Sequence, residues 1–94
     1  MIKVTYYRDD MRLFLSGHAG YAPLGEDIVC AGISSLACTL GMHTGVKTIQ
    51  TESQLLLVAR ENVKENIRDL FDLIVNGMRE IAKKYPDCVH VKTF

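Results

Sequence analysis

The residues best suited to chemistry lie in one short segment, SGHAGYAPLGEDIVCAG, at positions 16–32. It places His18 in a glycine-rich stretch and Cys30 twelve residues later, at the start of an apolar run. A cysteine attacks as its thiolate, so it needs a group that removes its proton and surroundings that favour negative charge. A histidine can take the proton, and the first turn of a helix favours the charge. His18 and Cys30 are therefore a candidate base and nucleophile.

Other features of the segment could support this pair. Unpaired backbone N–H groups at a helix start can donate to the oxygen that becomes negative when a thiolate attacks a carbonyl. Ser34 follows Cys30 by one helical turn, which predicts that both side chains share one face. Asp27 could orient the imidazole or cap the helix.

The segment between the two candidate residues, from Ala19 to Glu26, is predicted to be a loop. It contains Gly20, Pro23 and Gly25 within six positions, which is too much backbone freedom and too many breaks for a regular element. The loop is long enough to bring the histidine and the cysteine together. Its aromatic residue, Tyr21, could pack against a substrate side chain or against its own domain.

Each of these residues also has an ordinary structural interpretation. Cysteine is among the most buried residue types, so Cys30 could instead belong to the core. His18 could be a turn residue, and Ser34 could bond back to the preceding turn. Cys38, on roughly the same helix face, is predicted to pack in the core. Spacing alone thus leaves a cysteine hydrolase unproven.

A metal site is only weakly indicated. Cys88, His43 and His90 have no partner at metal-ligand spacing, and no C-x-x-C occurs in the chain. The first residues are not expected to form a secretory signal, and the three cysteines are an odd number. They are expected as free thiols in a reducing compartment.

Composition excludes several classes of protein. With 94 residues, the chain is expected to form one domain over positions 1–94. Eleven basic and eleven acidic residues leave a net charge of zero, which disfavours nucleic-acid binding as the main function. No apolar stretch approaches the roughly 18 residues of a membrane span, so the protein is expected to be soluble and not exported.

The spacing of apolar residues predicts seven elements in the order β-β-α-β-β-α-β. They are strands at 2–7 and 13–16, a helix from 27 to about 41–45, strands at 46–50 and 54–60, a helix carrying the apolar stripe from 63 to 82, and a strand within 88–94. The simplest way to bury both helical stripes is an α+β two-layer sandwich, a mostly antiparallel sheet with two helices on one face. The other face is left to solvent or to a second subunit.

The segment SGHAGYAPLGEDIVCAGISSLA resembles the signature of the ribosomal-processing cysteine protease family. In that family G-H-A, a glycine-containing loop, G-x-D-I-V-C-A and a following serine occur in this order. The chain length, the early hairpin and the long second helix agree with the family. The resemblance implies that Cys30 is the nucleophile, that His18 is the general base, and that Asp27 and Ser34 are supporting polar residues.

The resemblance also implies a biological role. Members of the family are bacterial cytoplasmic endopeptidases that remove an N-terminal extension from large-subunit ribosomal protein number twenty-seven. They are homodimers, and a flexible loop, here residues 19–26, closes over the substrate. The leading hypothesis is therefore a dimeric cytoplasmic cysteine endopeptidase that needs no metal or organic cofactor. The alternatives are a non-catalytic ribosome-associated peptide-binding or assembly module and, third, a metal-binding module.

Overall fold

The structure is a computed structural model that describes residues 1–17, 20, 27–61 and 67–94. Its elements are β1 (Ile2–Tyr7), β2 (Arg12–Ser16), α1 (Ile28–Gly41), β3 (Val46–Gln50), β4 (Gln54–Ala59), α2 (Ile67–Lys84) and β5 (Val89–Thr93). This confirms the predicted element order and places each strand boundary within about a residue of its predicted position. Neither helix in the described ranges has the length and hydrophobicity needed to cross a membrane.

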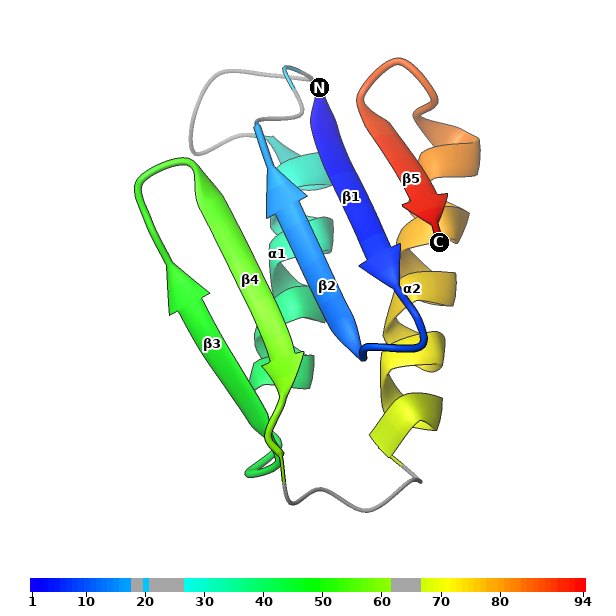
Figure 1. The fold of residues 1–94 in the computed structure, drawn as a ribbon. Coiled ribbons are helices and arrows are strands. Elements are labelled where there is room, and N and C mark those ends of the chain that lie inside the picture. Colours follow the sequence, from blue (N-terminus) through cyan, green and yellow to red (C-terminus); the bar gives the residue numbers. More distant parts are fainter. Residues whose placement is uncertain (18–19, 21–26, 62–66) are drawn as a thin grey trace.

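The five strands form one sheet in the order β3-β4-β2-β1-β5. Three of the four neighbouring pairs are antiparallel, and β1 with β5 is parallel. Both helices lie on the same side of this sheet, with α1 behind β2 and β4 and α2 nearer β1 and β5 (Figure 1). The predicted α+β two-layer arrangement is confirmed, and the edge strand β3 extends beyond the two helices.

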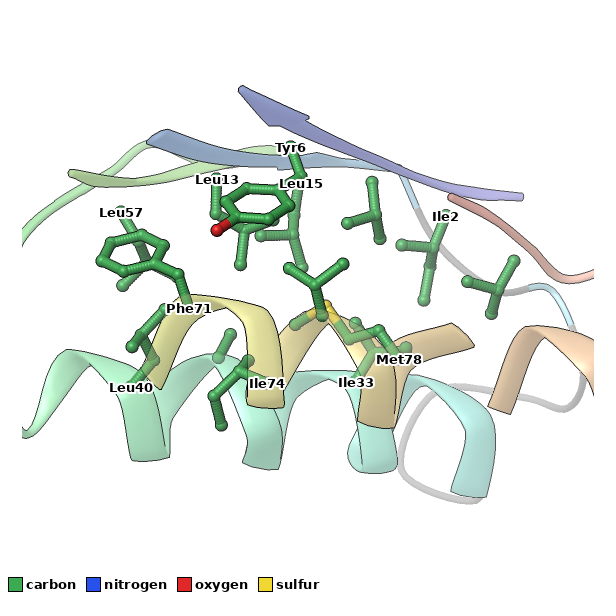
Figure 2. Packing of buried hydrophobic residues seen from close by; sticks show 14 of the residues in the cluster. Ile2, Tyr6, Leu13, Leu15, Ile33, Leu40, Leu57, Phe71, Ile74 and Met78 are labelled. Carbon is green, nitrogen blue, oxygen red and sulfur yellow. The ribbon is translucent and has the colours of Figure 1, made fainter. Parts of the chain in front are cut away.

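The core lies between the sheet and the helix layer. Alternate strand residues such as Tyr6, Leu13 and Leu57 point from the sheet toward the helices (Figure 2). They meet residues of both helices, including Ile33 of α1 and Phe71 of α2. All five are at most 2% exposed, so the faces predicted to be apolar do form the core. This packing fixes α1 against the sheet.

Two glycines let the helices approach one another closely. A Cβ atom added at Gly32 of α1 would lie 3.1 Å from Cδ1 of Ile81 on α2. One added at Gly77 of α2 would lie 3.2 Å from Cδ1 of Leu36 on α1. A glycine costs an exposed helix roughly 1 kcal/mol relative to alanine, and the close packing offsets that cost here. The two contacts hold α1 on both sides of its midpoint.

A polar cluster joins β1 to α2. The Tyr6 hydroxyl donates to Oδ1 of Asp72 at 2.6 Å, and the Arg8 guanidinium contacts Oδ2 of the same carboxylate at 3.0 Å. Burial, followed by the hydrogen bond to Asp72, raises the pKa of Tyr6 above its usual value. The hydrogen bond from Arg8 lowers the pKa of the Asp72 carboxyl, so this carboxyl favours its charged form.

Candidate active site

Cys30 occupies the first turn of α1, and Asp27 caps that turn. The backbone of Asp27 is extended, with φ −80° and ψ 96°, and its Oδ1 accepts a hydrogen bond from the N–H of Cys30 at 2.9 Å. Asp27 is thus an N-cap, one of the two roles considered from the sequence. The cap fixes the backbone of the candidate nucleophile.

The cap also determines which N–H groups at the helix start are available. The first bond within α1 runs from the N–H of Ala31 to the carbonyl of Asp27 at 3.0 Å. The N–H groups of Ile28 and Val29 precede that bond and have no acceptor within the helix. Since Asp27 already accepts from Cys30, these two groups are the helical donors that could face a negative oxygen.

The Cys30 side chain lies at the boundary between the core and a surface groove. It is half-buried and packs against the core residues on one side. On the other side it lines a groove of about 410 Å³, which Ser34 also lines. Cys30 and Ser34 therefore share one face of α1, as their spacing predicts. The half-buried position resolves the choice between core and surface that the sequence left open.

The predicted base, His18, lies outside the described residues, as do Tyr21 and Gly25. The chain is, however, well fixed at the residue before His18. Gly17 has φ +87°, and its N–H donates to the carbonyl of Ser53 at 3.3 Å. Gly17 lines the same groove as Cys30. The chain therefore leaves β2 at this groove, one residue before His18.

Gly17 is a site-forming residue that sequence reasoning did not single out. A Cβ added there would lie 2.3 Å from the carbonyl oxygen of Met1. Only glycine fits that position and adopts its left-handed conformation without strain. Gly20, the one described residue between positions 18 and 26, also has a positive φ, of +68°, and is exposed. The only signal for Gly17 in the sequence is that it is a glycine. A glycine indicates conformational freedom of the backbone, but it does not indicate which residues lie nearby.

The groove lies between α1 and the hairpin of β3 and β4. Successive strand residues point to opposite faces of a sheet. On β3, the side chains that face the helix are therefore those of Val46, Thr48 and Gln50. Val46 is 4% exposed, whereas Thr48 and Gln50 are exposed and line the groove. The space between α1 and β3 therefore widens from Val46 toward Gln50, and a hollow remains beside the helix.

The prediction that Cys38 packs in the core is wrong. Cys38 is exposed and lines the groove two turns beyond Cys30. The core face of α1 is instead formed by Val29, Ile33, Ala37 and Leu40. Cys38 is left exposed because its side of the helix borders the groove and not the core.

The described residues do not form a metal-binding cluster. No three histidine, cysteine, aspartate or glutamate side chains gather at metal-binding distances among residues 1–17, 20, 27–61 and 67–94. Cys30, Cys38 and Cys88 are free thiols. The chemistry that the described site can support is that of a thiol at a helix start, beside a groove.

Comparison with known proteins identifies the family. The sequence profile of the family described as cysteine protease Prp matches residues 1–90. The chain belongs to the Prp family. This confirms the resemblance drawn from the segment around Cys30, and it makes the protein a cysteine-type peptidase. No match was found among curated proteins.

Solved structures of similar fold include Prp proteins. One is the essential ribosomal processing protease Prp from S. aureus in complex with a covalently linked product peptide, which has a TM-score of 0.81 and 14% identity. The alignment covers 99% of this chain and 97% of that one. SMU.848 from Streptococcus mutans has a TM-score of 0.67 and 21% identity, with coverage of 99% and 91%. At these identities the likeness establishes that this Prp family member shares their fold.

Proposed function

We propose that the protein is an endopeptidase in which Cys30 is the nucleophile and His18 the general base and acid. Its proposed substrate is large-subunit ribosomal protein twenty-seven, from which it removes a short N-terminal extension during ribosome maturation. The observation that carries the proposal is the position of Cys30 on the first turn of α1, at a groove, in a chain of the Prp family. The S. aureus Prp structure in complex with a covalently linked product peptide supports it, since nucleophilic catalysis passes through a covalent intermediate.

In this mechanism the thiolate of Cys30 attacks the scissile carbonyl carbon, and His18 holds the thiol proton. The N–H groups of Ile28 and Val29 donate to the oxygen that becomes negative. The tetrahedral intermediate collapses to a thioester while His18 gives its proton to the leaving amine. Water, deprotonated by His18, then hydrolyses the thioester and regenerates the thiol. No metal or organic cofactor takes part.

Supporting residues complete the proposed site. Asp27 acts through its cap, which orients the first turn and thereby Cys30. Ser34 is exposed in the groove one turn beyond the nucleophile, where its hydroxyl can bond to the substrate backbone. The loop at residues 19–26, with Gly20, Tyr21 and Gly25, is proposed to close over the substrate.

We also propose that the protein acts as a cytoplasmic homodimer, through the open face of the sheet. The strand pairing places Phe14, Leu56 and Ile49 in one row on the face away from the helices. Phe14 and Leu56 are partly exposed and Ile49 is exposed. Tyr7 and Phe94 stack on one another at a centroid distance of 5.5 Å and are exposed. Aromatic and large apolar side chains of this kind are enriched at protein interfaces. Neither nucleic acid nor membrane is a proposed partner.

The decisive test of the processing reaction uses the organism's own ribosomal protein twenty-seven with its extension. It is incubated with the wild type, with Cys30→Ser and with Cys88→Ser, and the products are weighed by mass spectrometry. The wild type and Cys88→Ser should shorten the substrate at one bond, whereas Cys30→Ser should leave it intact. An extension that survives the wild-type protein would show that the substrate assignment is wrong.

Thiol reactivity tests the roles of Cys30 and His18 directly. Cys30 should alkylate faster than Cys38 and Cys88 at neutral pH, and His18→Ala should reduce that difference. Since Cys38 is exposed, its rate is the reference for an accessible thiol without a base. Equal rates at Cys30 and Cys38 in the wild type would contradict the assignment of a base–nucleophile pair.

A further inference from the structure

The groove runs along α1, and its length can be compared with the length of an extended peptide. Cys30, Ser34 and Cys38 follow one another along α1 at intervals of four residues, and all three line the groove. At a rise of about 1.5 Å per residue, Cys38 lies about 12 Å from Cys30 along the helix axis. An extended peptide advances about 3.3 Å per residue. A peptide that enters at Cys30 and runs beside α1 thus places about its fourth residue at Cys38.

The groove narrows at Gly41, about 16 Å along the axis from Cys30. A Cβ added to Gly41 would lie 3.0 Å from Oγ1 of Thr48 and 3.4 Å from a methyl carbon of Leu57. Helix and sheet are therefore in contact at this point, and there is no room beneath for a side chain. The groove consequently accommodates about five extended residues on one side of Cys30.

The walls of the groove are nearly free of charge. Among the described residues that line it, the only charged side chain is Glu52, in the turn between β3 and β4. That turn adjoins Gly17, through the hydrogen bond to Ser53, and so lies at the Cys30 end. Away from this end the walls are formed by thiol, hydroxyl, amide and aliphatic groups. A charged substrate residue that lay beside Cys38 would lose hydration without gaining a partner.

From this geometry we infer that the groove binds an extended, uncharged segment of about five residues on one side of the scissile bond, with Cys38 as a specificity-determining residue at the fourth position. The inference rests on the proposed function, because it takes Cys30 as the point of cleavage. It assigns Cys38 a contact with the substrate but no part in the chemical step.

Length dependence is the first test. Labelled peptides spanning the cleavage site of ribosomal protein twenty-seven are prepared with two, four, five, six or eight residues on either side of the bond. For the wild type, kcat/KM should rise at least tenfold as one side grows from two to about five residues, and then level off. A lysine or aspartate at the fourth position on that side should lower kcat/KM at least fivefold. No dependence on length on either side would overturn the inference.

Cys38→Phe tests the specificity residue, with Thr39→Phe as its matched control. Thr39 is the next residue, is exposed, and lies outside the groove lining, with its hydroxyl bonded to the carbonyl of Ser35. Cys38→Phe should raise KM for the longest peptide at least fivefold and leave cleavage of the shortest peptide unchanged. Thr39→Phe should affect neither. Equal effects of the two variants would overturn the assignment of Cys38.

A binding measurement separates this inference from the proposed catalysis. In Cys30→Ala, which cannot react, the longest peptide at saturation should slow alkylation of Cys38 at least fivefold while the rate at Cys88 stays constant. Protection of Cys38 without any cleavage by the wild type would support the groove and refute the peptidase. Cleavage by the wild type without protection of Cys38 in Cys30→Ala would refute the groove and leave the peptidase standing.

Discussion

The replacement of Gly17 by alanine is the sharpest perturbation that the structure offers, because two separate effects act at this residue. Its φ of +87° lies in the left-handed region, which side chains other than glycine rarely adopt. The new Cβ would also lie 2.3 Å from the carbonyl oxygen of Met1. That oxygen cannot withdraw freely, since the N–H of the following Ile2 donates to the carbonyl of Cys88 at 2.8 Å.

The expected loss in the free energy of unfolding is the sum of these two effects. A left-handed conformation costs a residue with a Cβ about 1 to 2 kcal/mol relative to glycine. To reach even 3.0 Å, the Cβ and the Met1 oxygen must move apart by about 0.7 Å. Overlap of this kind typically adds about 1 to 3 kcal/mol. Gly17→Ala should therefore lower the free energy of unfolding by about 2 to 5 kcal/mol, and it should displace the chain just before His18.

Gly20→Ala provides the control for the conformational term alone. Gly20 also has a positive φ, of +68°, but a Cβ there would meet no atom within 4 Å. Its replacement should cost about 1 to 2 kcal/mol, and urea denaturation measures both variants. On the extended ribosomal protein, Gly17→Ala should lower kcat/KM by about 10- to 100-fold, since small misplacements of a base have effects of this size. Equal losses of stability in the two variants would refute the argument from the Met1 contact.

Three further perturbations test other parts of the structure. Asp27→Ala should lower the free energy of unfolding by about 1 kcal/mol through loss of the cap, and Asp27→Asn should restore most of it in urea denaturation. The pKa of Asp72 is lowered by the hydrogen bond from Arg8, so its contribution to stability is present above the carboxyl's unfolded value and is lost as the pH falls through its lower folded value. The stability difference between wild type and Asp72→Asn should thus be largest near neutral pH and shrink below about pH 4, and a constant difference would contradict the role of this ion pair. Leu56→Lys should shift the protein from dimer to monomer in analytical ultracentrifugation, whereas Leu73→Lys, at an exposed position of α2, should not.

The elements that sequence patterns predicted well are those whose determinants are local. The alternation in Ile2–Tyr7 and the helical stripe that ends before Pro86 each reflect one buried face, so the sheet and both helices were predictable. Asp27 marked the start of α1 because a capping side chain acts within a single turn. The spacing of Cys30 and Ser34 placed them on one face for the same reason.

The features that the sequence patterns missed depend on contacts between segments that are distant in the chain. Helical spacing indicates that Cys30 and Cys38 share a face, but it does not say that the face meets an edge strand. Thr48 and Gln50, which form the opposite wall, lie far along the chain and carry no catalytic signature. The contact between Gly17 and Met1 likewise joins two segments whose proximity only the folded sheet establishes.

The division of α1 into a core face and a groove face has a consequence for altering this protease by design. Ile33 and Ala37 carry the packing, while Ser34, Cys38 and Met42 border the groove and are exposed. Substitutions on the second set leave the buried surface intact, and surface changes of this kind usually alter stability by less than about 0.5 kcal/mol. Substrate preference can thus vary on one side of a single helix while the fold is maintained by the other.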